Sequence, residues 1–239
     1  MNYYLINLKR TPERLTNFIS NNPGFEFTRF EAIDGQTVDR THLLEQNIIT
    51  QSIADRYTSG AIGVAMSHRQ LWQKCIELGE PITVIEDDAY LNKNFKTVVE
   101  HNTAINDGWD FIYWGSNLDQ KIVVEMIPSV TLTTLETDAN LLVNNINRFQ
   151  NLNISTIFYK CLFAVGLVCY SVSPKGARYL LDMCFPLRDY DKPYLNFGID
   201  HAVLETLPEI MGYIVIPPLA LTTNNQSEST VQNEFNSHR

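Results

Sequence analysis

Basic residues are scarce in this chain. Of 239 residues, 18 are lysine or arginine against 27 aspartates and glutamates, which gives a formal net charge of −9 and a pI near 5.0. Nucleic-acid-binding domains usually carry a basic face that neutralises phosphates, so this balance argues against a nucleic acid as partner. An anionic substrate would need a metal ion or a local cationic patch.

Long apolar runs and paired cysteines are missing as well. The longest apolar run, residues 161–170, is too short to span a bilayer. The start MNYYLINLKR lacks the basic leader and the small-residue cleavage site of a secretory signal. The four cysteines lie in apolar segments without C-x-x-C spacing, which is typical of reduced core thiols. We therefore expect a cytoplasmic protein without a membrane-spanning segment.

The chain does contain an alternation of apolar strand and helix patterns. Strand patterns at residues 3–8, 27–35, 81–88 and 109–115 alternate with helix patterns, of which residues 61–78 form the longest. Such alternation predicts an α/β fold with a Rossmann-like, mostly parallel sheet flanked by helices.

Residues 1–220 are interpreted as a single domain. A chain of this length buries roughly 70–75% of the surface that its unfolded form exposes, so one large domain is the default expectation. The region around residues 121–157 is Asn-rich with weak helical spacing, and we interpret it as a variable insertion. The polar residues 221–239 are expected to form a loosely ordered tail.

The stretch ITVIEDDAYL places three carboxylates in a row at the end of a buried strand pattern. Because side chains alternate along a strand, Glu86 and Asp88 are expected on one face and Asp87 on the other. Ligands bind at the carboxyl ends of strands in open α/β sheets, and grouped carboxylates suit Mg²⁺ or Mn²⁺. The alternative is a solvated acidic cluster, or a helix-capping group, where the strand meets water.

Seven short motifs resemble one known family. In order along the chain they are INLKRTPERL, FEAIDG, GAIGVAMSHRQLW, VIEDDAYL, YSVSPKGARYLL, GIDHAV and IPPLA. Together they resemble glycosyltransferase family 25, the lipooligosaccharide-biosynthesis glycosyltransferases. The resemblance implies a GT-A-like fold, in which a Rossmann-like sheet binds a UDP-sugar donor. It also implies an acidic D-x-D-like motif that holds Mn²⁺ or Mg²⁺ on the diphosphate.

The resemblance suggests roles for the acidic stretch. By analogy with such folds, Asp88 is expected to ligate the metal ion directly, and Glu86 to make ribose or water-mediated contacts. Asp87 is expected to support the metal site.

Four residues nearer the N-terminus are expected to contact the sugar nucleotide. Asn7, Arg10 and Arg14 come at the end of the first strand and into the following helix, and a guanidinium suits a diphosphate. The resemblance adds His68 on the long helix. The alternatives are that Arg14 pairs on the helix surface, that Asn7 satisfies turn backbone, and that His68 is a packed core residue.

The motif GIDHAV bears on the mechanism. If the reaction inverts the anomeric centre, a base must take the proton of the acceptor hydroxyl, and Asp200 is the candidate. His201 is the alternative base, or a late ligand of the metal ion. Asp200 could instead simply cap its helix, which the sequence alone does not decide.

The leading hypothesis is a glycosyltransferase that moves a hexose onto a terminal sugar of lipooligosaccharide or a related surface glycan. Galactose from UDP-galactose, in β linkage, is the first expectation. A lipid-linked oligosaccharide acceptor would bring the protein to the inner face of the inner membrane as a peripheral protein. The rival hypotheses are a metal-dependent sugar-nucleotide nucleotidyltransferase and a non-catalytic sugar- or metal-binding module. Against the first rival, no Gly-rich phosphate loop lies near the N-terminus.

Overall fold

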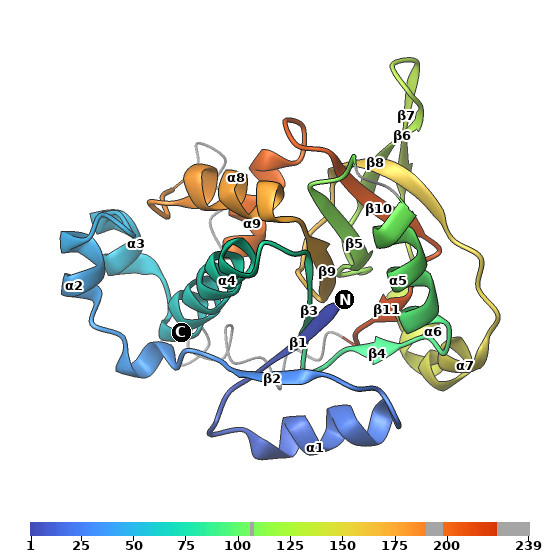
Figure 1. Ribbon diagram of the computed structural model, residues 1–239, viewed down its shortest axis with the longest axis horizontal. Coiled ribbons are helices and arrows are strands. Elements are labelled where there is room, and N and C mark those ends of the chain that lie inside the picture. Colours follow the sequence, from blue (N-terminus) through green and yellow to red (C-terminus); the bar gives the residue numbers. More distant parts are fainter. Residues whose placement is uncertain (106–107, 190–197, 224–239) are drawn as a thin grey trace.

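A nine-stranded sheet forms the centre of the molecule (Figure 1). The computed structural model describes residues 1–105, 108–189 and 198–223. Within these ranges the strand order is β2-β1-β3-β9-β5-β10-β8-β6-β7, and a second small sheet pairs β4 with β11. The strands are β1 (Asn2–Asn7), β2 (Thr28–Glu31), β3 (Ile82–Glu86), β4 (Tyr90–Leu91), β5 (Phe111–Gly115), β6 (Ile122–Ile127), β7 (Thr131–Leu135), β8 (Ile157–Phe163), β9 (Cys169–Val172), β10 (Gly212–Ile216) and β11 (Ala220–Leu221).

The sheet is mixed, so the α/β class is confirmed and the mostly parallel arrangement is wrong. Parallel pairing joins β1 to β2 and β3, and β5 to β10. However, β9 lies between β3 and β5 and is antiparallel to both. Beyond β10, strands β8, β6 and β7 are added in antiparallel fashion. A short buried strand has the same apolar pattern in either direction, so the sequence of β9 gave no sign of its reversal.

Helices cover both faces of the sheet (Figure 1). Their bounds are α1 (Pro12–Asn21), α2 (Arg40–Glu45), α3 (Gln51–Arg56), α4 (Ser59–Leu78), α5 (Phe95–Ile105), α6 (Ala139–Asn144), α7 (Ile146–Asn151), α8 (Pro174–Cys184) and α9 (Ile199–Thr206), with a 3₁₀ turn η1 (Gly35–Thr37). None of the described helices is long and apolar enough to cross a membrane.

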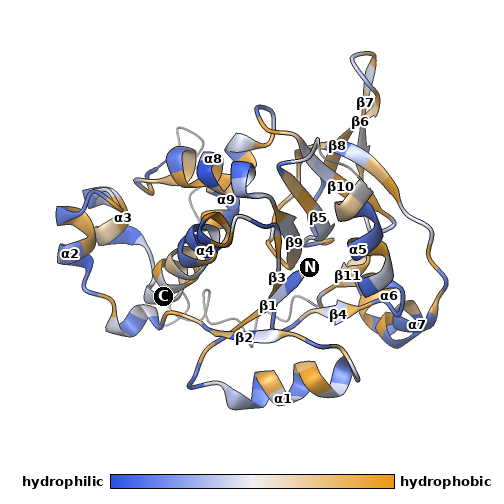
Figure 2. Cartoon of the chain, in the orientation of Figure 1, coloured by the Kyte–Doolittle hydropathy of each residue, from blue (hydrophilic) through white to orange (hydrophobic). Residues whose placement is uncertain are grey.

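Strand alternation divides the interior into two cores. Val84 and Tyr113 point to the face covered by α4, α8 and α9. Their neighbours Ile85 and Trp114 point to the opposite face, covered by α1 and α5. The helices mix apolar and polar stretches in the hydropathy colouring, as expected of helices that pack one side against a sheet (Figure 2).

Helix α4 is the longest helix and forms one wall of the site described below. Thr58 caps its start by accepting a hydrogen bond from the backbone N–H of Ala61. Gly79 ends the helix in the left-handed conformation, with φ of 66°. Leu71 and Trp72 are completely buried, so this helix packs deeply against the sheet.

The region expected to be an insertion extends the sheet. Strands β6 and β7 form a hairpin that projects from the body of the molecule and exposes Ile127, Val130 and Leu132 (Figure 1). Near the C-terminus, β11 pairs with β4, and Thr222 is still buried. The ordered domain therefore extends beyond residue 220, and residues 224–239 of the expected tail lie outside the described ranges.

Candidate functional site

A pocket of about 530 Å³ lies at the carboxyl ends of β1 and β3, beside α4 and the start of α9. We call it the central pocket. Its volume lies within the range of about 300–1,000 Å³ that is usual for ligand sites. Every side chain that the sequence pointed to lines this pocket: Asn7, Arg10, Arg14, His68, Glu86, Asp87, Asp88, Asp200 and His201.

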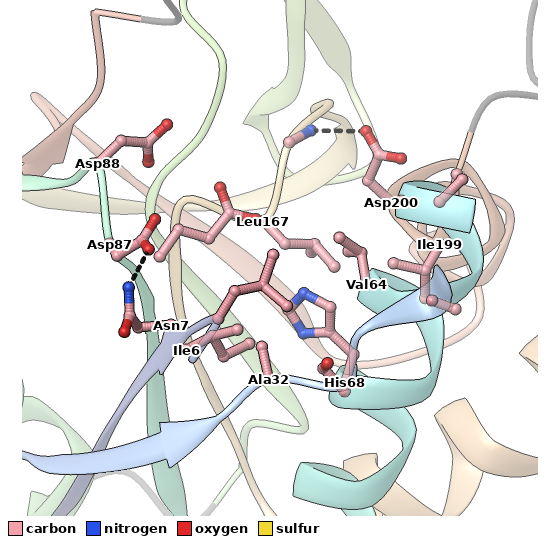
Figure 3. A pocket seen from close by; sticks show the side chains of 18 of the residues that line it. Ile6, Asn7, Ala32, Val64, His68, Asp87, Asp88, Leu167, Ile199 and Asp200 are labelled. Atoms are coloured by element: carbon pink, nitrogen blue, oxygen red, sulfur yellow. Dashed lines mark hydrogen bonds between the residues drawn. The ribbon is translucent and has the colours of Figure 1, made fainter. Parts of the chain in front are cut away.

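The acidic stretch turns inside the central pocket. Strand β3 ends at Glu86, and Asp87 and Asp88 form a turn, so the expected alternation of the three carboxylates is wrong beyond Glu86. Asp87 does not point away. Its Oδ1 accepts a hydrogen bond from Arg14 Nε at 2.8 Å and another from Arg14 Nη2. Its Oδ2 accepts a hydrogen bond from Asn7 Nδ2 at 2.7 Å (Figure 3).

Arg14 is therefore a partly buried residue that pairs with the acidic turn, and the alternative of an ion pair on the helix surface is wrong. Its Nη2 also lies 3.7 Å from Asp88 Oδ2, so one guanidinium serves two carboxylates. Burial works to lower the pKa of Arg14, but Asp87, Asp88 and Glu86 together raise it above its ordinary value. This arginine stays charged at every accessible pH.

Asp88 has one oxygen without a partner. Its Oδ1 is buried and has no hydrogen-bond partner among the described residues, although the side chain as a whole is 37% exposed. Burial and the charge of Asp87 raise the pKa of Asp88. The charge of Arg14 and a hydrogen bond with Thr222 lower it, but the net shift is upward. Thr222 reaches Asp88 because β11 pairs with β4 directly after the acidic turn.

Glu86 lies at the end of β3, within the same group of carboxylates. Burial, followed by the charges of Asp88, Asp200 and Asp87, raises its pKa to about 8, while Arg14 acts in the opposite direction. A carboxyl of this kind holds a proton at neutral pH until a cation or a donor approaches.

Arg10 occupies the rim. Its Nε donates to Asp34 Oδ2 at 2.8 Å, and the side chain is about half exposed. The loop that carries Asp34 is held against α4 by backbone contact. A Cβ added to Gly63 would lie 2.4 Å from the carbonyl oxygen of Ile33, and one added to Gly35 would overlap the carbonyl of Ser59. Both glycines are needed for this close approach.

Asp200 lies across the central pocket from the acidic turn (Figure 3). The N-cap position of α9 is occupied by Gly198, which has no side chain to cap the helix. Asp200 lies in the first turn and is therefore not the capping residue. Its Oδ2 accepts a hydrogen bond from the N–H of Gly166 at 3.2 Å, and its Oδ1 lies 3.3 Å from His201 Nδ1.

The surroundings of Asp200 favour its ionised form. Burial alone would raise its pKa, but the hydrogen bond and charge of His201 and the backbone N–H groups of Gly166 and His201 lower it below the ordinary value. Gly166 has φ of +85°, and a Cβ there would lie 2.4 Å from the side chain of Asn117. The loop between β8 and β9 thus fixes this carboxylate.

His68 forms the inner wall of the central pocket. It is 1% exposed, and its Nδ1 lies 2.8 Å from the hydroxyl of Tyr170 on β9. The aromatic residues of the next strand pattern, Trp109, Tyr113 and Trp114, are buried core residues that do not line the pocket.

The side chains fit a divalent cation only in part. Within the described ranges, no three His, Cys, Asp or Glu side chains are grouped closely enough to hold a metal ion. Both oxygens of Asp87 already accept hydrogen bonds, and His201 lies beside Asp200. Asp88, with its partnerless buried oxygen, is the side chain that fits.

Comparison with known proteins identifies the family. A family model described as "Glycosyltransferase family 25 (LPS biosynthesis protein)" matches residues 1–195, well over half of the chain. The chain belongs to glycosyltransferase family 25. The match includes the acidic turn and its arginine, whereas Asp200 and His201 lie after the matched residues. Their roles in this family 25 chain therefore depend on geometry.

Its relatives include proteins named glycosyltransferases and proteins named inactive. A glycosyltransferase 25 family member of Aedes aegypti is 32% identical over 125 residues, which cover 47% of this chain and 20% of that protein. The inactive glycosyltransferase 25 family member 3 of Mus musculus is 26% identical over 145 residues, which cover 54% of this chain and 24% of that protein. A Haemophilus influenzae protein, provisionally named a glycosyltransferase, is 24% identical over 243 residues, which cover 96% of this chain and 74% of that protein. This family 25 chain thus spans about a fifth to a quarter of the animal relatives.

Several residues of the site gave little signal in the sequence. Thr222 lay in the expected tail, and Asn117 and Tyr170 lay in strand or loop patterns without charge. Gly166 was the exception, because a lone glycine inside the apolar run of residues 161–170 marks a bend or a close backbone approach.

Proposed function

We propose that this family 25 protein is a metal-dependent glycosyltransferase that moves a hexose from a UDP-sugar to a glycan. The favoured donor is UDP-galactose, the favoured product a β linkage, and the favoured acceptor a terminal sugar of lipooligosaccharide or a related surface glycan. The observation that carries the proposal is one pocket with an arginine-bound acidic turn on one side and an ionised aspartate on the other.

The diphosphate of the donor is assigned to the side of the acidic turn. Asn7, Arg10 and Arg14 lie there, and Arg14 supplies the interior positive charge. Six acidic side chains nevertheless line the same cavity, namely Asp34, Glu86, Asp87, Asp88, Asp119 and Asp200, so a diphosphate would be repelled unless a cation accompanied it. Mn²⁺ or Mg²⁺, held by Asp88, by water and by the phosphates themselves, fits this requirement. When bound, such an ion would supply positive charge to offset the charge that develops on the departing UDP.

Asp200 is assigned as the base. UDP-hexoses are α-linked, so a β product requires attack from the face opposite the leaving diphosphate. A base for the acceptor hydroxyl must then lie across the sugar from the diphosphate, as Asp200 lies across the central pocket from the acidic turn (Figure 3). Its carboxylate is ionised at neutral pH and can take the proton as the new glycosidic bond forms. His201 orients this carboxylate.

A GT-A-like arrangement and a peripheral position at the inner face of the inner membrane belong to the same proposal. A lipid-linked acceptor supplies the reason for the membrane position. The exposed apolar hairpin tip, with Ile127 and Val130, offers a surface that tolerates an apolar neighbour.

A non-catalytic module is the second candidate, because relatives of this chain include proteins named inactive. It would bind a UDP-sugar in the central pocket without turnover. The nucleotidyltransferase alternative is disfavoured by the family match.

A thermal-shift screen of UDP-sugars, each with Mn²⁺ and with EDTA, tests the proposal. A ligand that binds the folded state alone raises the melting temperature by mass action. We expect stabilisation by UDP-galactose with Mn²⁺, little effect with EDTA, and release of UDP on addition of a glucose- or GlcNAc-terminated acceptor. Stabilisation without UDP release across a donor and acceptor panel would support the binding module. No stabilisation by any UDP-sugar would refute the proposed function.

A further inference from the structure

Three buried side chains form a hydrogen-bonded chain behind the central pocket. Trp72 Nε1 donates to the hydroxyl oxygen of Tyr170 at 2.9 Å, and this hydroxyl lies 2.8 Å from His68 Nδ1. Trp72 and Tyr170 are completely buried, and the Tyr170 ring stacks on Phe111 with centroids 4.7 Å apart. His68 and Trp72 are four residues apart on α4, so both reach Tyr170 from the same helix face.

The direction of these hydrogen bonds fixes the position of the imidazole proton. Indole N–H is a donor only, so the Tyr170 oxygen must accept from Trp72. Among the described residues, the remaining partner of this hydroxyl is His68 Nδ1. Burial raises the pKa of Tyr170, so the hydroxyl keeps its proton, and a buried hydroxyl proton needs an acceptor. Nδ1 is therefore the acceptor, and a neutral imidazole carries its proton on Nε2.

The imidazole is neutral under ordinary conditions. Burial lowers the pKa of His68 to about 4, and the charge of Asp200 opposes this only in part. Nε2 has no hydrogen-bond partner within the described part of the chain. A buried donor without a partner is costly, which suggests that its partner arrives with a ligand.

The position of His68 indicates what this ligand is. Figure 3 shows its ring among Ile6, Val64, Leu167 and Ile199, between the acidic turn and Asp200. If the diphosphate lies at the acidic turn and the base acts at Asp200, the group between them is the hexose. We infer that His68 donates its Nε2–H to an oxygen of the transferred hexose, and that Trp72 and Tyr170 hold it in the tautomer that does so. This inference rests on the proposed function.

The tautomer can be measured without any activity. Long-range ¹H–¹⁵N correlation spectra of the imidazole nitrogens distinguish a protonated from an unprotonated ring nitrogen, and His68→Gln identifies the His68 signal among the five histidines. We expect Nε2 protonated and Nδ1 unprotonated in the wild-type protein, and an appearance of the Nδ1-protonated form in Tyr170→Phe. An Nδ1-protonated His68 in the wild type would overturn the inference and leave the proposed function standing.

Binding measurements test the sugar contact. We expect His68→Ala to weaken UDP-galactose binding in the presence of Mn²⁺ about tenfold, the value of one hydrogen bond, while the Kd for UDP alone stays within about twofold. His68→Gln keeps an amide donor near the Nε2 position and should recover part of the lost affinity. It also provides a second variant in case the alanine variant misfolds. The exposed His101→Gln is the matched control and should change neither Kd.

The possible failures are distinguishable. Equal losses of affinity for UDP and UDP-galactose in His68→Ala would place His68 at the nucleotide and overturn the hexose contact. Unchanged affinity for both would overturn it as well. A wild-type protein that binds no UDP-sugar would refute the proposed function and the hexose contact together, even with the expected tautomer in the spectrum.

Discussion

Replacement of Glu86 by glutamine should stabilise the protein at neutral and alkaline pH and have little effect in acid. The folded state holds the pKa of Glu86 at about 8 against an ordinary value of 4.5. The folded chain thus retains a proton that the unfolded chain releases, and stability falls as the pH rises from about 4.5 to about 8. Glutamine has the same shape and nothing to ionise, so the variant should escape this loss.

The magnitude follows from the distance between pH 7 and the ordinary pKa. That distance is about 2.5 pH units, and each unit is worth about 1.4 kcal/mol, which sets an upper limit of about 3.5 kcal/mol. Water at the open pocket reduces this, so we expect a gain of about 1–3 kcal/mol at pH 7. The gain should approach zero near pH 4.5 and level off above pH 8.

Urea unfolding at pH 5, 6, 7 and 8 measures the difference in free energy of unfolding between the two proteins. The exposed Glu45→Gln serves as the matched control and should show no comparable dependence on pH. A gain for Glu86→Gln that is equal at pH 5 and pH 8, or a loss at pH 8, would show that Glu86 is not held protonated. The reasoning about the acidic turn would then be refuted.

Three further variants test the site. Asp88→Asn should abolish Mn²⁺-dependent UDP-sugar binding in calorimetry without lowering the melting temperature, and unchanged metal dependence would remove Asp88 from the cation site. Asp200→Asn should keep UDP-sugar binding but reduce turnover about 10²–10⁴-fold, and retained turnover would exclude it as the base. Gly166→Ala should lower the free energy of unfolding in urea by about 1–3 kcal/mol and reduce turnover. The added methyl group would collide with Asn117, and alanine is also unfavourable at the positive φ of this position. Gly24→Ala has a similar φ of +77° in open space and should show the conformational cost alone; equal effects of the two glycine variants would contradict the proposed support of Asp200.

Local patterns in the sequence predicted the elements better than their order. The helix expected at residues 61–78 agrees with α4 (Ser59–Leu78) to within two residues, because helical spacing is a local signal. The position of β9 between β3 and β5 depends on pairing between residues 54 to 90 positions apart, such as Ile82 with Val172. No local property of either strand states which partner it will find, or in which direction.

The structure brings the candidate site residues together, but the sequence did not predict how they contact one another. Asn7, Glu86 and Asp200 line one pocket because strand ends and helix starts gather at the same edge of the sheet. That Arg14 would bind Asp87, 73 residues away, depends on how α1 packs below the sheet. The sequence did not indicate this pair, because the expectations for Arg14 were a diphosphate contact or an ion pair on the helix surface.

The contact between Gly35 and Gly63 limits how this protein can be engineered. One wall of the central pocket is set by backbone against backbone, with no space for a single methyl group at either position. A mutant library for altered donor choice should keep both glycines, since any side chain there would push the loop off α4 and lose the pocket. Ala32 and Val64, which line the same wall with short side chains, are the positions at which size can be varied.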